Sequence, residues 1–131
     1  MTFNQEQAEA ALAKWQKILR LQDWDIKIFI YRAKDLMTDG QAEVTWLREK
    51  KQAILKLLDP IDYDNNYFIQ DHEVSIVHEL LHCHMALFDQ EAGTLEDIAQ
   101  EQAIHALSFA LVELDRKNRE GEDFSGKVFG S

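Results

Sequence analysis

The sequence predicts an α+β domain in which helices pack on a small β-sheet. Segments at both ends of the chain carry apolar residues at helical spacing, whereas residues 24–58 alternate apolar and polar side chains as strands do. Between these regions and the last helix, residues 74–88 are apolar nearly all round, which is typical of a buried helix. The chain has 131 residues, enough for one domain with its own core, which we predict to span residues 1–119.

The first predicted helix begins near Thr2. Gln5 follows three residues later, so each side chain can satisfy a backbone amide of the other. The helix ends near residues 21–23. Its apolar stripe consists of Ala8, Ala11, Leu12, Trp15, Ile18 and Leu19. This pattern predicts a surface helix packed on the rest of the domain.

Three strands are predicted at residues 24–31, 42–47 and 53–58. In the first strand, Ile26, Ile28 and Ile30 recur at every second position. Asp39 and Gly40 mark a turn before the second strand, and the third ends before Pro60, because proline cannot donate a ladder hydrogen bond. Their order along the chain predicts a three-stranded antiparallel meander.

Two helices follow the strands. Asp71 is a suitable N-terminal cap for the apolar helix of residues 74–88. A break around Gly93 separates it from a long helix predicted over residues 95–118. Residues 120–131 are poor in apolar side chains and are predicted to form a disordered tail.

Composition limits the possible partners and cellular compartment. The formal charge of −10 argues against a surface for nucleic acid or an anionic membrane. Cys83 is the single cysteine, so neither an intrachain disulfide nor a thiolate zinc site can form. Residues 1–20 are polar and amphipathic, without the apolar run typical of a signal peptide, and no window reaches the length of a transmembrane helix. These features predict a soluble, cytoplasmic protein.

The segment His78-Glu79-Leu80-Leu81-His82 has the HExxH pattern. Residues four apart lie on one helix face, so His78 and His82 can bind the same metal ion. Glu79 is offset by about 100°, a position from which a carboxylate can act on a metal-activated water. Three such polar groups on an otherwise apolar helix require partners, and zinc would supply them.

A catalytic zinc site needs a third protein ligand. Glu91, Glu96 and Asp97 are nearby candidates, but Glu91 and Glu96 flank the break, where water can solvate them. Glu101 differs, because it interrupts the predicted core-facing side of the last helix, where a carboxylate is costly unless it is paired or binds a metal. His105 follows one turn later and remains an alternative ligand.

The HExxH pattern, followed after eighteen residues by Glu101, resembles the gluzincin metallopeptidases. The order of helices and strands resembles a minimal zincin core, and small metallopeptidases of phages and prophages have this size and layout. The resemblance implies that His78, His82 and Glu101 bind Zn²⁺, that Glu79 is the general base, and that the substrate is a peptide or protein. Related small folds use a third histidine, which would make His105 the ligand and Glu101 its support.

The resemblance also implies where a substrate would lie. In zincins an edge strand holds an extended peptide, and residues 53–58 precede the HExxH helix as that strand does. A second electrophile is needed for the oxyanion. The candidates are His105, His72, Tyr63 and Tyr67. His84 points away from the HExxH histidines and is given no role.

Two other interpretations are compatible with a metal. The first is a non-catalytic zinc-binding protein, regulatory or structural, that keeps the zincin fold. The second is a ferritin-like di-iron bundle, since Glu79 and His82 form an ExxH pair. A bundle needs a second ExxH, but Glu101 and His105 are one residue too far apart, and the strands argue against it.

Overall fold

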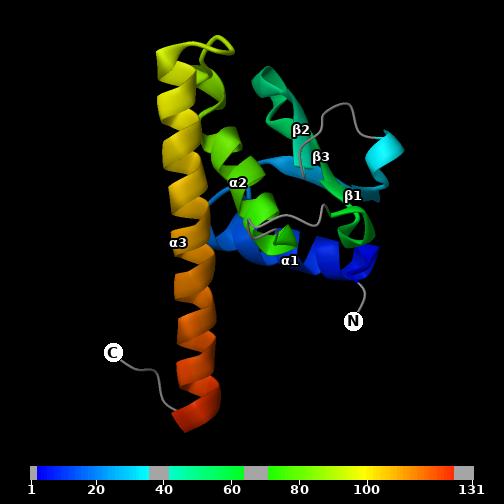
Figure 1. Ribbon diagram of the computed structural model, residues 1–131, viewed down its shortest axis with the longest axis vertical. Helices are drawn as coiled ribbons and strands as arrows, with labels where there is room; N and C mark the ends of the chain where they lie inside the picture. Colours follow the sequence, from blue (N-terminus) through cyan, green and yellow to red (C-terminus); the bar gives the residue numbers. More distant parts are fainter. Residues whose placement is uncertain (1–2, 36–41, 64–70, 126–131) are drawn as a thin grey trace.

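The computed structural model describes residues 3–35, 42–63 and 71–125, and the side chains among them up to residue 120. The predicted α+β class is confirmed (Figure 1). Its main elements, separated by short 3₁₀ turns, are α1 (Gln5–Ile18), β1 (Asp25–Tyr31), β2 (Ala42–Leu47), β3 (Gln52–Leu58), α2 (His72–His84) and α3 (Leu95–Ser125).

The sheet is mixed, so the predicted antiparallel meander is wrong. Its strand order is β1-β3-β2, with β3 parallel to β1 and antiparallel to β2. Consecutive strands are usually neighbours, and this tendency favoured the meander. However, in the described sheet β2 pairs with β3 alone, and β3 lies between the two strands that precede it in the chain.

The central position of β3 also corrects the expected substrate strand. Both edges of β3 are occupied, by β1 and by β2, so an extended peptide cannot add to residues 53–58. The sequence does carry a sign of this position, because residues 53–58 form a nearly continuous apolar run that only Lys56 interrupts, as in interior strands. In the described sheet, β1 and β2 are the edge strands.

One face of the sheet packs against α1 and α2, and this layer contains the core. Ala8, Leu12 and Trp15 of α1 contact the inner side chains of the strands and of α2. The cap of α1 is Asn4, whose side-chain oxygen accepts a hydrogen bond from the backbone amide of Gln7. The backbone amide of Asn4 in turn donates to the side-chain oxygen of Gln7. The helix therefore starts later than the predicted Thr2 cap.

Helix α2 is the buried centre of the fold. As predicted, Asp71 caps it, accepting hydrogen bonds from the amides of Glu73 and Val74. Ile76, Val77 and Leu80 are almost completely buried. The helix ends at His84, earlier than the predicted residue 88, and Ala86–Phe88 form a 3₁₀ turn instead.

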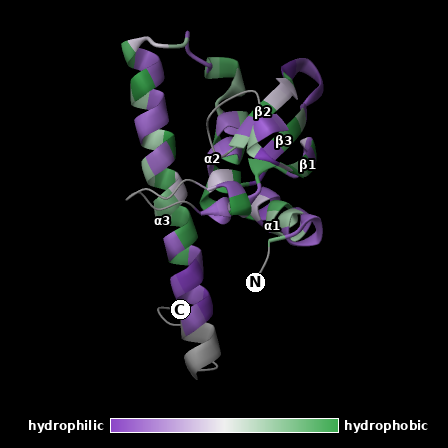
Figure 2. Ribbon diagram, turned by 45° about the vertical axis from the view of Figure 1, so that its right-hand side comes forward, coloured by the Kyte–Doolittle hydropathy of each residue, from purple (hydrophilic) through white to green (hydrophobic). Residues whose placement is uncertain are grey.

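Helix α3 packs along α2 and then extends past the rest of the fold (Figure 1). It continues to Ser125, beyond the predicted end at residue 118, and residues 126–131 of the predicted tail lie outside the described residues. Its buried face carries Ile104, Ser108 and Val112, whereas the apolar residues Leu107 and Leu114 are exposed. Figure 2 shows that the projecting part is largely hydrophilic. None of the helices in the described ranges is long and apolar enough to cross a membrane.

Candidate metal centre

Helix α2 places two histidines side by side. His78 and His82 are one turn apart, and their ring centroids are separated by 5.1 Å. Both side chains are partly buried, with exposed fractions of 21% and 14%. The surrounding apolar residues of α2 fix the helix in the core, so the positions of both imidazoles are set by packing.

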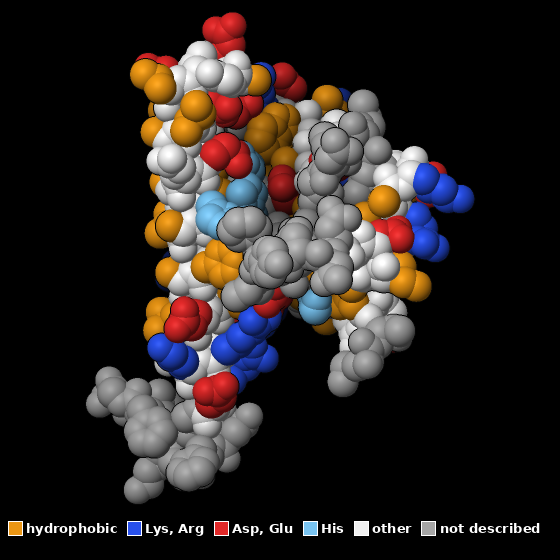
Figure 3. Space-filling view, viewed as in Figure 1, with side chains coloured by type: hydrophobic (Ala, Val, Ile, Leu, Met, Phe, Trp, Pro, Cys, Tyr) orange, Lys and Arg blue, Asp and Glu red, His pale blue; other side chains and the backbone are white. Residues whose placement is uncertain are grey.

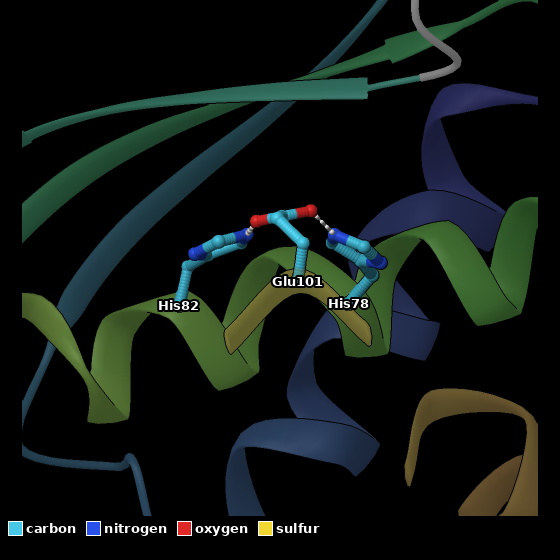
Figure 4. Close-up of side chains that lie close together, drawn as sticks. All are labelled: His78, His82 and Glu101. Carbon is cyan, nitrogen blue, oxygen red and sulfur yellow. Dashed lines mark hydrogen bonds and ion pairs between the residues drawn. The ribbon is translucent and has the colours of Figure 1, made fainter. Parts of the chain in front are cut away.

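Helix α3 brings Glu101 to the two histidines (Figure 4). Glu101 Oε1 lies 2.7 Å from His82 Nε2, and Oε2 lies 3.2 Å from His78 Nε2. One carboxylate therefore bridges both imidazoles. The sequence predicts a buried acid at Glu101, but its side chain is 44% exposed, because it lies at the edge of the α2–α3 contact.

The three side chains have a donor set that suits zinc. One ligand atom from each of His78, His82 and Glu101 lies within 4.8 Å of the others. Two imidazole nitrogens with one carboxylate oxygen is a known catalytic zinc set that leaves the fourth position open. The group is also accessible, because all three side chains are partly exposed. Figure 3 shows histidine side chains at the surface beside α3, with acidic side chains next to them. The residues present therefore fit a zinc ion.

Glu79 follows the first histidine and is shielded from water. Burial raises the pKa of its carboxyl to about 8, and the negative charges of Glu101 and Glu43 add to this effect. Burial likewise lowers the pKa of His78, against the opposing influence of Glu101. The site thus combines one imidazole, that of His78, which favours the neutral form that metal ligands require, with a carboxyl able to hold a proton near neutral pH.

His105, the alternative ligand, lies next to this group but outside it. Its ring centroid is 6.4 Å from that of His78, and its ring packs edge-to-face on Phe109 at 5.0 Å. The structure brings Glu101, not His105, within ligand distance of the two α2 histidines. Glu91 and Glu96, the solvated candidates, are exposed as expected.

The remaining candidates for oxyanion stabilisation lie elsewhere or are not described. His72 stacks on Phe3, with 3.8 Å between ring centroids, at the start of α2. Burial raises the pKa of Tyr63 to about 12, and the acids Asp71 and Asp59 contribute, which places it near the same end of α2. Tyr67 lies outside the described residues. His84 Nε2 lies 2.6 Å from the Leu19 carbonyl oxygen, consistent with no role at the metal centre.

The sequence did not identify one neighbour of the site, Trp46, or the role of Glu73 at the start of α2. Trp46 of β2 faces His82, with ring centroids 6.4 Å apart, so the edge strand β2 forms one wall of the site. Trp46 falls on the same side of β2 as Ala42 and Val44, but only the strand order puts it beside α2. Glu73 lies away from the site, and its partners come from α1 and α3, so they could not be inferred from local spacing.

Glu73 is the centre of a buried ionic cluster, which we call the Glu73 cluster and define as Lys14, Trp15, Asp71, Glu73 and Arg116. Its carboxylate accepts from Lys14 Nζ at 2.6 Å, Trp15 Nε1 at 2.7 Å and Arg116 Nη2 at 3.1 Å. Arg116 also donates to Asp71. The cluster therefore ties α1 and α3 to the start of α2.

No protein-family model, curated protein or solved structure matches this chain.

Proposed function

We propose that this protein is a zinc-dependent metallopeptidase of the gluzincin type, which hydrolyses peptide bonds in a peptide or protein substrate. The observation that carries the proposal is the meeting of His78, His82 and Glu101 from two helices, with Glu79 beside them. We also propose that it acts in the cytoplasm, because a single cysteine suits a reducing compartment.

Each of these residues has a distinct role in the proposal. His78, His82 and Glu101 would hold the zinc ion. When bound, zinc polarises a carbonyl group and lowers the pKa of water to about 7. Glu79 would accept a proton from that water and later deliver it to the leaving amine. The raised pKa of Glu79 supports proton transfer near neutral pH, and a bound cation would shift it downward by favouring the carboxylate.

The edge strand β2 is the proposed docking strand for the substrate. It pairs with β3 along one edge, and Trp46 faces His82 across the site. An extended peptide can add to such an edge through backbone hydrogen bonds. This role passes from residues 53–58 to residues 42–47, because the structure places β2 and not β3 at the edge of the sheet.

His105 is the favoured donor to the oxyanion. A second electrophile beside the metal stabilises the charge that develops on the carbonyl oxygen. The ring of His105 is next to His78, whereas His72 and Tyr63 lie near the beginning of α2. Proximity to the metal centre therefore supports His105 over those two residues.

The experiment compares wild type with Glu79→Gln. Zinc content is measured by atomic absorption, and cleavage is followed by mass spectrometry with an unbiased peptide library. We expect one zinc per chain in both proteins, with peptide cleavage at least about 100-fold slower in Glu79→Gln, since a general base contributes 10²–10⁴-fold. Glu96→Gln is the matched control, because it changes an exposed acid at the start of α3.

The outcomes separate catalysis from metal binding. If wild type holds one zinc but cleaves no peptide, the metallopeptidase proposal fails and the non-catalytic zinc protein is correct. If Glu79→Gln retains full activity, the assigned base is wrong. His82→Ala should lose the zinc, and an unchanged zinc content in that variant would place the metal elsewhere.

A further inference from the structure

A pocket outside the candidate metal centre lies where the ends of α1 and α2 meet the turn between β2 and β3. It is an open cavity of about 240 Å³. Arg20 lines it from the turn after α1, Arg48 and Lys51 from the β2–β3 turn, and Leu87 and Phe88 from the 3₁₀ turn after α2. His78, His82 and Glu101 do not line it. The pocket is therefore separate from the candidate metal centre.

This pocket is positively charged, whereas the whole chain has a formal net charge of −10. Three cationic side chains line it together with one acid, Asp23, which Lys51 Nζ contacts at 2.5 Å. Arg48 Nη1 donates to the Ala86 carbonyl oxygen at 3.0 Å, which leaves its charge uncompensated. Neither Arg20 nor Arg48 forms an ion pair with a carboxylate of the described residues. Two guanidinium groups are thus available to an anion.

The rest of the pocket wall is apolar. Leu21 and Trp24 are buried side chains that line the pocket. Leu87 and Phe88, in contrast, are 82% and 65% exposed, which is unusual for such large apolar residues in adjacent positions. The pocket therefore combines a cationic side with an apolar side, as recognition of an amphipathic anion requires.

The backbone gives an independent reason to assign a role to the charges. Arg20 and Lys51 have φ angles of 60° and 51°, and they are the non-glycine residues with positive φ in the described part of the chain. This conformation favours glycine, above all just after a helix end, where Arg20 lies. The chain nevertheless carries a long cationic side chain at both positions, and both line the same pocket. Departures from local preference of this kind concentrate at functional sites.

We propose that this pocket binds a carboxylate joined to an apolar side chain, as found in the C-terminal residue of a peptide. The planar guanidinium groups of Arg20 and Arg48 match the geometry of a carboxylate. The apolar side chain packs against Leu87 and Phe88. A volume of about 240 Å³ is smaller than the roughly 300–1,000 Å³ of drug-sized pockets, so the site accommodates about one residue. This inference does not depend on the proposed peptidase activity.

The probe is N-acetyl-phenylalanine, and its neutral amide is the matched control ligand. Each is titrated into ¹⁵N-labelled full-length protein, and chemical-shift changes of backbone amides are followed by NMR. We expect saturable shifts at Leu21, Ala86 and their neighbours with the acid, and an affinity at least about tenfold weaker with the amide, because the amide lacks the charge.

Arg20→Gly is the decisive variant. It removes the guanidinium and gives the backbone the residue that its positive φ favours, so the variant should unfold at a temperature close to that of wild type. Its affinity for the acid should fall at least about tenfold. Lys17→Gln is the control variant, because it removes an exposed positive charge of α1 that does not line the pocket.

Three results would overturn the proposal. The first is equal binding of the acid and the amide, or no saturable shift with either. The second is an Arg20→Gly variant that binds as tightly as wild type, or a Lys17→Gln variant that loses as much affinity as Arg20→Gly. The third is a set of shifts confined to the residues around His78 and His82, which would place the carboxylate at the metal centre.

Discussion

Replacing Glu73 by glutamine should destabilise the fold by removing the charge at the centre of the Glu73 cluster. Glutamine keeps the volume and one carbonyl oxygen, so Trp15 Nε1 can retain its hydrogen bond. The two hydrogen bonds from Lys14 and Arg116 lose their charged acceptor, and the new NH₂ group faces donors. The variant therefore isolates the electrostatic contribution of the cluster from its packing.

The magnitude follows from two charge-assisted hydrogen bonds. Each contributes about 1.5–3 kcal/mol when buried. Lys14 and Arg116 are 33% and 42% exposed, so water replaces part of what they lose. We expect a loss of roughly 2–3 kcal/mol in the free energy of unfolding, and a melting temperature lower by about 8–12 °C for a domain of this size.

Urea and thermal unfolding followed by circular dichroism provide the measurement. Glu113→Gln is the matched control, because that acid is 67% exposed and pairs with Lys117 one turn away, so its loss should change stability by no more than about 0.5 kcal/mol. If Glu73→Gln is as stable as wild type, the cost of burying the carboxylate equals the gain from its partners. The Glu73 cluster would then contribute nothing to stability, and the reasoning would be refuted.

Three further predictions concern acid, the core and the metal. Burial raises the pKa of Asp71 and Glu73, but basic partners and hydrogen-bond donors outweigh it and hold both values below normal. Both carboxylates therefore stabilise the fold above about pH 4.5. Urea titrations at several pH values should show this contribution being lost as pH falls through the lowered folded-state pKa values. Ile76→Ala should cost about 2–5 kcal/mol, because Ile76 is completely buried, whereas Ile98→Ala, at a half-exposed position of α3, should cost far less when unfolded by the same method. If the proposed metal centre is correct, zinc at about 100 times its Kd should raise the free energy of unfolding by about 2.7 kcal/mol in wild type, but not in His82→Ala or after chelation by EDTA, as a thermal-shift assay can show.

The sequence predicted what depends on local spacing. The i, i+4 relation of His78 and His82 is a property of any helix, and the apolar residues around them required that helix to be buried. The class of the fold followed from periodicity in the same way. The strand order did not, because alternation within β1, β2 and β3 gives each strand its inner face but not its neighbours.

Glu101 was selected from the sequence for a reason that the structure modifies. An acid on a presumed core face suggested a buried ligand, yet the buried face of α3 is centred on Ile104, Ser108 and Val112, and Glu101 lies at its margin. The amphipathic pattern of α3 is ambiguous because Leu107 and Leu114 are apolar but exposed. Only the packing of α3 on α2 decides which side faces inward.

The relation between the Glu73 cluster and the metal centre follows from how α3 is held against α2. The two helices run antiparallel, since Arg116 of α3 contacts Asp71 at the start of α2, whereas Glu101 contacts His82 near its end. These two polar contacts lie about 22 Å apart along α3, at 1.5 Å per residue. Together they fix the register of α3 against α2. Packing of apolar side chains alone would allow a helix to settle in neighbouring registers, but bidentate contacts between Arg116 and Asp71 do not. A shift of α3 by a single residue would rotate Glu101 by about 100° away from both histidines. The Glu73 cluster can therefore act as the structural determinant that keeps Glu101 beside His78 and His82, although it contacts none of these three residues.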